Sequence, residues 1–189
     1  MNFNRLAPLY DSFHRGAQRT AGMIVTSLGL NKNTSVLDLG GGTGRIAGLL
    51  IDYVREVTVL DSSSGMIEQC KRKNKKGVHC LVGDATSLPF APESFDLVIM
   101  VDAFHHFQDK EKVMIEVRQV LRPQGKVLLE EFHPRRLKGF LVMLLERFFH
   151  TGSVFFEPEQ LARYWQKAGF QVEIKNGNKG VYFLLGRKG

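Results

Sequence analysis

Short apolar runs alternate with amphipathic segments along most of the chain. The apolar runs are rich in β-branched residues and are bounded by Gly, Asp or Pro, which is typical of buried strands. The segments between them carry apolar residues at helical spacing. This alternation predicts a parallel sheet with helices on both faces. The predicted strands are 36–39, 57–60, 78–82, 97–101 and 127–129, and the predicted helices are 20–28, 45–53, 64–73, 111–121 and 159–168.

The C-terminal part of the pattern is different. Two apolar runs, 170–174 and 181–185, flank the turn-rich stretch 176–180, which predicts an antiparallel hairpin. Together with the five earlier strands, the hairpin predicts an α/β fold with seven strands, most of them parallel. No repeat, low-complexity stretch or Pro/Gly/Ser-rich linker is visible, so we expect a single domain over residues 1–189.

A glycine-dense turn follows the first predicted strand, where Asp38 precedes the run 40–44 (Gly-Gly-Gly-Thr-Gly). Glycine permits positive φ and lets a ligand approach the backbone closely. In an open α/β sheet this turn lies at the edge where ligands bind. Neither the dinucleotide pattern G-x-G-x-x-G nor the Gly-Lys-Ser/Thr of a P-loop fits this run. A carboxylate beside the turn would repel a pyrophosphate and suits the ammonium of a methionine moiety.

Two further acids follow the next two strands. Asp61 ends the second strand and is placed to accept hydrogen bonds from both hydroxyls of a ribose. Asp84 follows the third strand and is placed to accept one from the amine of an adenine. Each acid alone is also explained as a strand-end or helix-cap residue. Three acids at the ends of three consecutive strands favour S-adenosylmethionine (SAM) over NAD, and an oxidoreductase is not expected.

At these residues the sequence resembles the class I SAM-dependent methyltransferases, and within them the group that includes the ubiquinone- and menaquinone-biosynthesis C-methyltransferases. The resemblance runs from Leu6 to Gly125 and fades afterwards. It implies a Rossmann-like fold and SAM as the cofactor, and its motifs are specific for SAM binding but hardly for the acceptor. The matching stretches are 6–11, 36–44, 61–66, 83–85, 88–90 and 94–98.

The resemblance also implies roles for individual residues. The loop at Asp38 would contact the methionine part of SAM, Asp61 the ribose, and the 84–85 pair the edge of the adenine. Met66 would pack on the adenine or simply belong to a helix core, and Tyr10 would fold over the cofactor or simply pack. The expected cofactor-binding residues are Tyr10, Asp38, Gly40, Gly42, Thr43, Asp61, Ser62, Met66, Asp84, Ala85 and Val101.

Candidate catalytic residues follow the fourth and fifth strands. Methyl transfer by in-line displacement mainly requires alignment, and it needs a general base only if the nucleophile carries a proton of high pKa. The candidates are His105 and His106 after the fourth strand, and Glu131 and His133 after the fifth. A His pair at this place is common in the resembled group, which favours a packing or positioning role. A His pair with acids can also bind a metal, but we expect none.

The acceptor is less well defined by the sequence. Residues 135–150 form an amphipathic pattern with a wide apolar face and basic flanks. This segment is a helix packed on the core, a cover for a hydrophobic acceptor, or a surface that makes transient contact with membrane lipid. In the resembled fold the insertion 133–157 would be part of a lid, and residues 1–30 would form an N-terminal helical cap. A small-molecule acceptor such as a prenylated quinol precursor would suit this cover.

The net charge of +7 raises the question of a nucleic-acid substrate. No Asn/Asp-Pro-Pro-aromatic motif follows the fourth strand, no Pro-Cys motif occurs, and a target-recognition domain has no room. Nucleic acid is therefore not the expected acceptor. A methyltransferase acting on nucleic acid or protein, and a SAM-binding scaffold without catalysis, stay open as alternatives, as does the oligomeric state.

The two cysteines and the N-terminus bear on the compartment. Cys70 and Cys80 stand at no metal or redox spacing, and Cys80 is expected to be a small buried residue, as in a reducing cytosol. The first ten residues lack the apolar region of a signal peptide, and no apolar run approaches the roughly 20 residues that cross a bilayer. We therefore expect a cytoplasmic enzyme.

Overall fold

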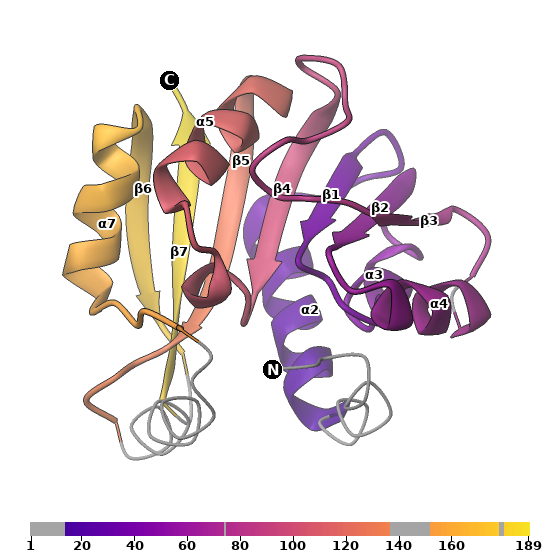
Figure 1. Cartoon of the computed structure of the whole chain (residues 1–189), viewed down its shortest axis with the longest axis horizontal. Coiled ribbons are helices and arrows are strands. Elements are labelled where there is room, and N and C mark those ends of the chain that lie inside the picture. Colours follow the sequence, from indigo (N-terminus) through magenta and orange to yellow (C-terminus); the bar gives the residue numbers. More distant parts are fainter. Residues whose placement is uncertain (1–13, 74, 137–151, 178–179) are drawn as a thin grey trace.

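The fold is a seven-stranded sheet with the strand order β3-β2-β1-β4-β5-β7-β6 (Figure 1). The computed structural model describes residues 14–73, 75–136, 152–177 and 180–189. The first five strands pair in parallel, and β7 pairs antiparallel with both β5 and β6. The predicted Rossmann-like sheet with a C-terminal hairpin is confirmed. The strands are β1 (Ser35–Leu39), β2 (Glu56–Asp61), β3 (Val78–Val82), β4 (Phe95–Val101), β5 (Leu121–Phe132), β6 (Phe170–Asn176) and β7 (Val181–Lys188).

Helices cover both faces of the sheet, and each face has its own hydrophobic core. The cluster on one face includes side chains of α5, α7 and η2, and the cluster on the other includes side chains of α2, α3 and α4. Figure 1 shows α5 in front of the sheet and α2 behind it. Among the described helices, none combines the length and the apolarity that crossing a bilayer requires. The helices are α2 (His14–Leu28), α3 (Ala47–Leu50), α4 (Ser64–Lys73), η2 (Phe104–His106), α5 (Lys110–Val120) and α7 (Pro158–Lys167).

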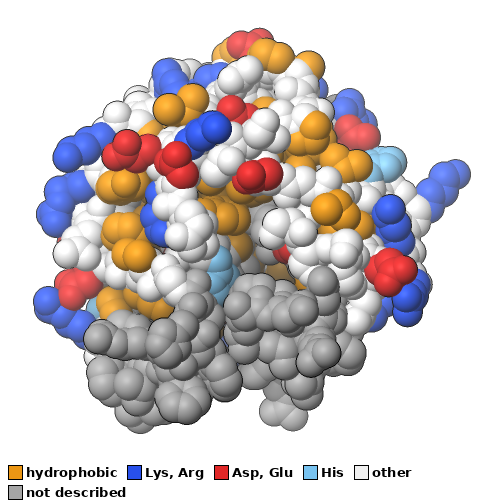
Figure 2. Space-filling model, in the orientation of Figure 1, with side chains coloured by type: hydrophobic (Ala, Val, Ile, Leu, Met, Phe, Trp, Pro, Cys, Tyr) orange, Lys and Arg blue, Asp and Glu red, His pale blue; other side chains and the backbone are white. Residues whose placement is uncertain are grey.

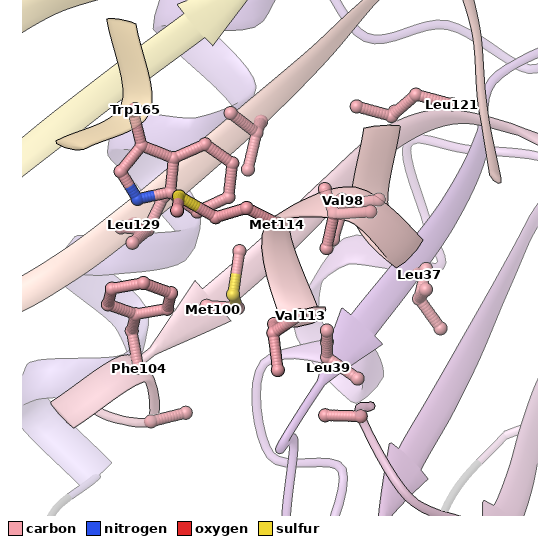
Figure 3. Packing of buried hydrophobic residues seen from close by; sticks show 14 of the residues in the cluster. Leu37, Leu39, Val98, Met100, Phe104, Val113, Met114, Leu121, Leu129 and Trp165 are labelled. Atoms are coloured by element: carbon pink, nitrogen blue, oxygen red, sulfur yellow. The ribbon is translucent and has the colours of Figure 1, made fainter. Parts of the chain in front are cut away.

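An aromatic group fixes the segment that follows β4. Phe104, the first residue of η2, is fully buried, and its ring centroid lies 5.6 Å from that of Trp165 on α7. Figure 3 shows these two rings beside Met100 and Met114. A buried aromatic side chain stabilises a fold by about 3–5 kcal/mol against truncation to Ala. Burial of Phe104 therefore fixes the position of the segment that contains the two histidines.

Several element boundaries differ from the prediction; helix α2, for example, begins at His14 rather than at residue 20. The helix expected over 45–53 is regular only over Ala47–Leu50, because residues 43–46 continue the turn of the glycine loop and no side chain caps the helix start. The fifth strand extends beyond the expected 127–129, because β4 pairs with residues 126–130 and β7 with residues 126–132. Pairing of the backbone thus keeps polar residues such as Lys126 and Glu130 in the strand.

The cysteines form a disulfide, which corrects the expectation for Cys80. The bond joins Cys70 on α4 to Cys80 on β3, with the two Cα atoms 6.1 Å apart. Cys80 is half-buried rather than buried. The spacing of ten residues carries no redox signature, and the pair meets because α4 packs against β3. The cysteines therefore give no support for a reducing compartment.

Candidate active site

The carboxyl ends of four neighbouring strands meet at one edge of the sheet. The register pairs Leu39 with Leu60 and Asp61 with Val82, and β4 runs parallel beside β1. The turns that follow these strands line a cavity of about 520 Å³, a volume usual for small-molecule sites. Figure 2 shows the hollow on this face, with hydrophobic side chains along its wall. Its lining includes the predicted residues Gly40, Gly42, Thr43, Asp61, Ser62, Met66, Asp84, Ala85 and Val101.

Backbone rather than side chains forms the wall at the glycine loop. Gly40 has φ +72°, and a Cβ placed there would lie 2.8 Å from the Cβ of Ala103. A Cβ on Gly41 would lie 2.5 Å from the carboxyl carbon of Asp38. The positive φ and the nearby Ala103 therefore exclude a side chain at Gly40, and the nearby carboxyl group of Asp38 excludes one at Gly41. The loop leaves a cradle in which a ligand can lie directly against the peptide groups.

Asp38 lies beneath this loop and does not line the cavity. Its side chain is 1% exposed, and the backbone of Gly41 lies against its carboxyl group. Burial, and secondly the negative charge of Asp61, raise the pKa of Asp38 to about 7, while Arg45 acts in the opposite direction. A cation bound in the cavity would favour the ionised form of Asp38. Asp38 can act on a ligand electrostatically through the loop, and the direct contact with the methionine part expected from the sequence stays a prediction.

The other two acids hold the backbone around them and still have capacity to accept hydrogen bonds. Oδ2 of Asp61 accepts a hydrogen bond from Gly42 N–H at 2.9 Å, and Oδ1 accepts one from Ser63 N–H at 2.8 Å. Burial raises the pKa of Asp61, and these two bonds oppose the shift. The exposed Asp84 accepts from the backbone N–H and the hydroxyl of Thr86 through Oδ1, and these bonds lower its pKa. Each carboxylate oxygen has two lone pairs, so both acids can also bind a nucleoside.

These features fit SAM and not a dinucleotide. The cavity has the carboxylates of Asp61 and Asp84 in its lining and that of Asp38 directly beneath it. The negative electrostatic potential of these carboxylates favours the ammonium and sulfonium of SAM and disfavours a pyrophosphate. The buried Met66 and Ala85 supply an apolar surface for a base.

The histidine pair follows the turn after β4, and its two rings have different surroundings. His106 lines the cavity, and its Nδ1 lies 2.9 Å from Oγ of Ser153. His105 is 1% exposed, and its Nδ1 lies 2.6 Å from Oε2 of the buried Glu131. His133 packs edge-on against Tyr182. Of the four predicted catalytic residues, all of which the structure describes, His106 alone is in the lining of the cavity.

Several residues that support the His105–His106 segment have no motif of their own in the sequence. Lys110 is 8% exposed, and its Nζ donates to the carbonyl oxygen of Phe107 at 2.5 Å. Burial lowers the pKa of Lys110. Phe155 stacks on the ring of His105 with centroids 4.5 Å apart, and the backbone N–H of Val154 donates to the His105 carbonyl. Lys110 lies close to the His pair in the sequence, whereas Val154 and Phe155 lie far from it and gave no sequence signal.

Some predicted features lie outside the described residues. Tyr10 and the rest of residues 1–13 are among them, as is 137–151, which contains most of the expected cover segment. The described flanks of the insertion are 133–136 and 152–157, and the second flank contacts the His105–His106 segment through Ser153 and Phe155.

Comparisons with known proteins agree with this geometry. Residues 37–129 match the family model described as a methyltransferase domain. The chain is 31% identical to a demethylmenaquinone methyltransferase of Thermotoga maritima, over 92% of this chain and 88% of that protein. It is 34% identical to a demethylmenaquinone methyltransferase of Thermus thermophilus, over 95% and 96%. A solved SAM-dependent methyltransferase from Thermotoga maritima superposes with a TM-score of 0.81 at 23% identity, over 100% of this chain and 99% of that one.

Proposed function

This chain belongs to the SAM-dependent methyltransferases, and from that premise we propose that it methylates a small hydroxylated aromatic acceptor of the quinol type. The observation that carries the proposal is that His106 lines the same cavity as the glycine loop. Phe107 and Gln108 line the cavity as well, so an apolar ring edge and polar groups both have partners there. The names of the two relatives, which both denote transfer to a quinone-type ring, support the same class of acceptor.

The residues around His106 suit a hydroxyl-bearing acceptor. When bound, SAM supplies a methyl group on a sulfonium, which the acceptor takes by in-line displacement. His106 would accept the proton of an acceptor hydroxyl, which raises the electron density of the ring carbon that attacks the methyl group. The S–CH3 bond breaks with S-adenosylhomocysteine as the leaving group, and the methylated carbon then releases its own proton to solvent, which restores the aromatic ring. Nδ1 of His106 lies 2.9 Å from Oγ of Ser153, and in the tautomer in which Nδ1 donates to that oxygen, Nε2 is the nitrogen that takes the proton.

We also propose that residues 133–157 form a lid over the acceptor, with residues 1–30 as a cap, inside a single domain over 1–189. The contact of 152–157 with the His105–His106 segment supports the position of such a lid. The basic and apolar stretch 135–150 would let the enzyme collect a prenylated acceptor at a lipid surface.

Transfer of a labelled methyl group from SAM tests the acceptor class. The acceptor used is a reduced prenylated naphthoquinone without the ring methyl group, beside an amine and an RNA as competing acceptors. Wild type should methylate the quinol. His106→Ala should lower kcat by about 10²- to 10⁴-fold, the usual contribution of a general base, with an unchanged dissociation constant for SAM.

The matched control is His79→Gln, because His79 lies on the exposed edge strand β3, away from the cavity. That variant should have the activity of wild type. Binding of SAM without transfer to the quinol would contradict the proposed acceptor and favour a SAM-binding protein without catalysis. Transfer to the amine or RNA instead would also contradict it.

A further inference from the structure

Asp102 stands at the turn between β4 and η2 with an unusual backbone. Its φ is +55°, in the left-handed region that residues other than glycine seldom occupy. The backbone N–H donates to the carbonyl of Glu130 on β5 at 2.9 Å, which helps to hold this conformation. Such conformations persist where the surrounding structure imposes them, and they concentrate at functional sites.

The two carboxylate oxygens of Asp102 have different environments. Oδ1 is buried, although the side chain as a whole is 41% exposed and lines the cavity. The carboxylate thus has one oxygen inside the protein, while the side chain as a whole borders the cavity that His106 also lines. A side chain held in this way is placed to accept a hydrogen bond from a ligand.

His105 connects this carboxylate to a second one in the core. Nε2 of His105 lies 3.9 Å from Oδ1 of Asp102, and Nδ1 lies 2.6 Å from Oε2 of Glu131. Oε1 of Glu131 also accepts the backbone N–H of His105, at 3.3 Å. On its faces the ring is held by Phe155 and by the ring of His106, whose centroid is 4.0 Å away. The imidazole therefore has a fixed position, with a carboxylate facing each nitrogen.

This arrangement favours a doubly protonated ring. A neutral imidazole that donates from Nδ1 to Glu131 would present a lone pair to Asp102, and two acceptors facing each other repel. An imidazolium donates a hydrogen bond from Nδ1 to Glu131, and its positive charge attracts the Asp102 carboxylate 3.9 Å from Nε2. Among the residues that the structure describes, the other titratable groups nearby include His106, Lys110, whose Nζ lies 3.4 Å from the His105 carbonyl, and Tyr182, whose pKa is raised by burial and by Glu131. Only Lys110 among these adds positive charge, and its Nζ faces the carbonyl rather than the ring.

We propose that Asp102 binds the acceptor by accepting a hydrogen bond from one of its hydroxyl groups, and that His105 and Glu131 are positioning residues that hold Asp102 for this role. The inference rests on the proposed function and adds a specificity determinant to it. His106 takes a proton, whereas Asp102 orients the ring through a different polar contact. Acceptors without a hydroxyl group would lose this contact, so the site selects hydroxylated rings.

Steady-state kinetics with the naphthoquinol acceptor test the binding role. Asp102→Asn keeps the shape of the side chain and removes its charge. It should raise the KM for the quinol about 10- to 100-fold, the effect of losing a hydrogen bond to a charged group, with an unchanged dissociation constant for SAM. Asp52→Asn, an exposed acid away from the cavity, is the control and should behave as wild type. An unchanged KM in Asp102→Asn would overturn the role of Asp102, whereas absence of transfer by wild type would count against the acceptor class.

Nuclear magnetic resonance of ¹⁵N-labelled histidine tests the positioning role without any acceptor. In wild type near neutral pH, both ring nitrogens of His105 should carry a proton. Asp102→Asn and Glu131→Gln should each lower the pH at which the ring loses a proton. Glu130→Gln is the matched control, because its carboxylate is the neighbour on β5 and bonds to Thr20 on α2 instead. A ring with the same titration in wild type and Asp102→Asn would overturn the positioning role, even if Glu131→Gln failed to fold.

Discussion

The backbone N–H of Gly42 donates a hydrogen bond to Oδ2 of Asp61 at 2.9 Å. This contact ties the glycine loop after β1 to the end of β2, so the acid expected to bind ribose also holds the loop expected to contact the methionine part of SAM. One side chain thus links two halves of the cofactor site. We therefore expect that removal of the Asp61 side chain weakens the binding of the whole cofactor and not of its ribose alone.

Asp61→Ala should weaken SAM binding by roughly ten- to a hundred-fold, because hydrogen bonds to a carboxylate contribute about 1.5–3 kcal/mol. Isothermal titration calorimetry with SAM measures the change. Asp52→Ala, an exposed acid away from the cavity, serves as the control. Undiminished binding in Asp61→Ala would refute the assignment of this cavity to SAM.

The raised pKa of Asp38 predicts a pH-dependent cost to folding. The pKa is about 7 in the folded chain against 3.8 ordinarily, so the folded state holds a proton that the unfolded state has released. Stability therefore falls as the pH rises above about 4, and the full penalty, on the order of 4 kcal/mol, is present above about pH 7. Asp38→Asn removes this penalty. Its stability relative to wild type should increase from pH 5 to 7 and stay level at higher pH.

Urea denaturation of both proteins without SAM, at several pH values from 5 to 9, checks this prediction. The test is whether the difference in unfolding free energy between Asp38→Asn and wild type changes with pH. The amide introduced by this substitution also alters local contacts, but that contribution to the difference does not depend on pH. A stability difference that is constant over the whole range would show that Asp38 is already ionised in the folded chain at pH 5.

Reduction of the Cys70–Cys80 disulfide should destabilise the chain by about 2–3 kcal/mol, since the bond closes a loop of about ten residues in the unfolded state. Urea midpoints with and without a reductant measure the effect. The double variant Cys70→Ala, Cys80→Ala should show no response to reductant. Two titratable thiols in the oxidised protein would contradict the disulfide.

Local pattern was enough for the fold because buried strands and amphipathic helices each have a period visible in a short window. The runs 36–39 and 57–60 lie within β1 and β2, and the hairpin after Phe170 was marked by its turn residues. Boundaries were less accurate where pairing decided them, as in β5, whose polar residues became part of the strand through its two neighbours. The disulfide was missed because only the packing of α4 on β3 brings its cysteines together.

By itself, the sequence determined the chemistry of the cofactor site, because a glycine loop and three strand-end acids lie at predictable places once a parallel sheet is inferred. The tertiary structure decided which of the candidate residues line the cavity and which lie behind it. It put Asp38 beneath the loop rather than in the cavity, turned His106 to the cavity and His105 to Glu131, and placed Asp102 beside them. Neighbouring residues such as 105 and 106 look alike in a sequence, and only long-range packing against β5 and residues 153–155 distinguishes their surroundings.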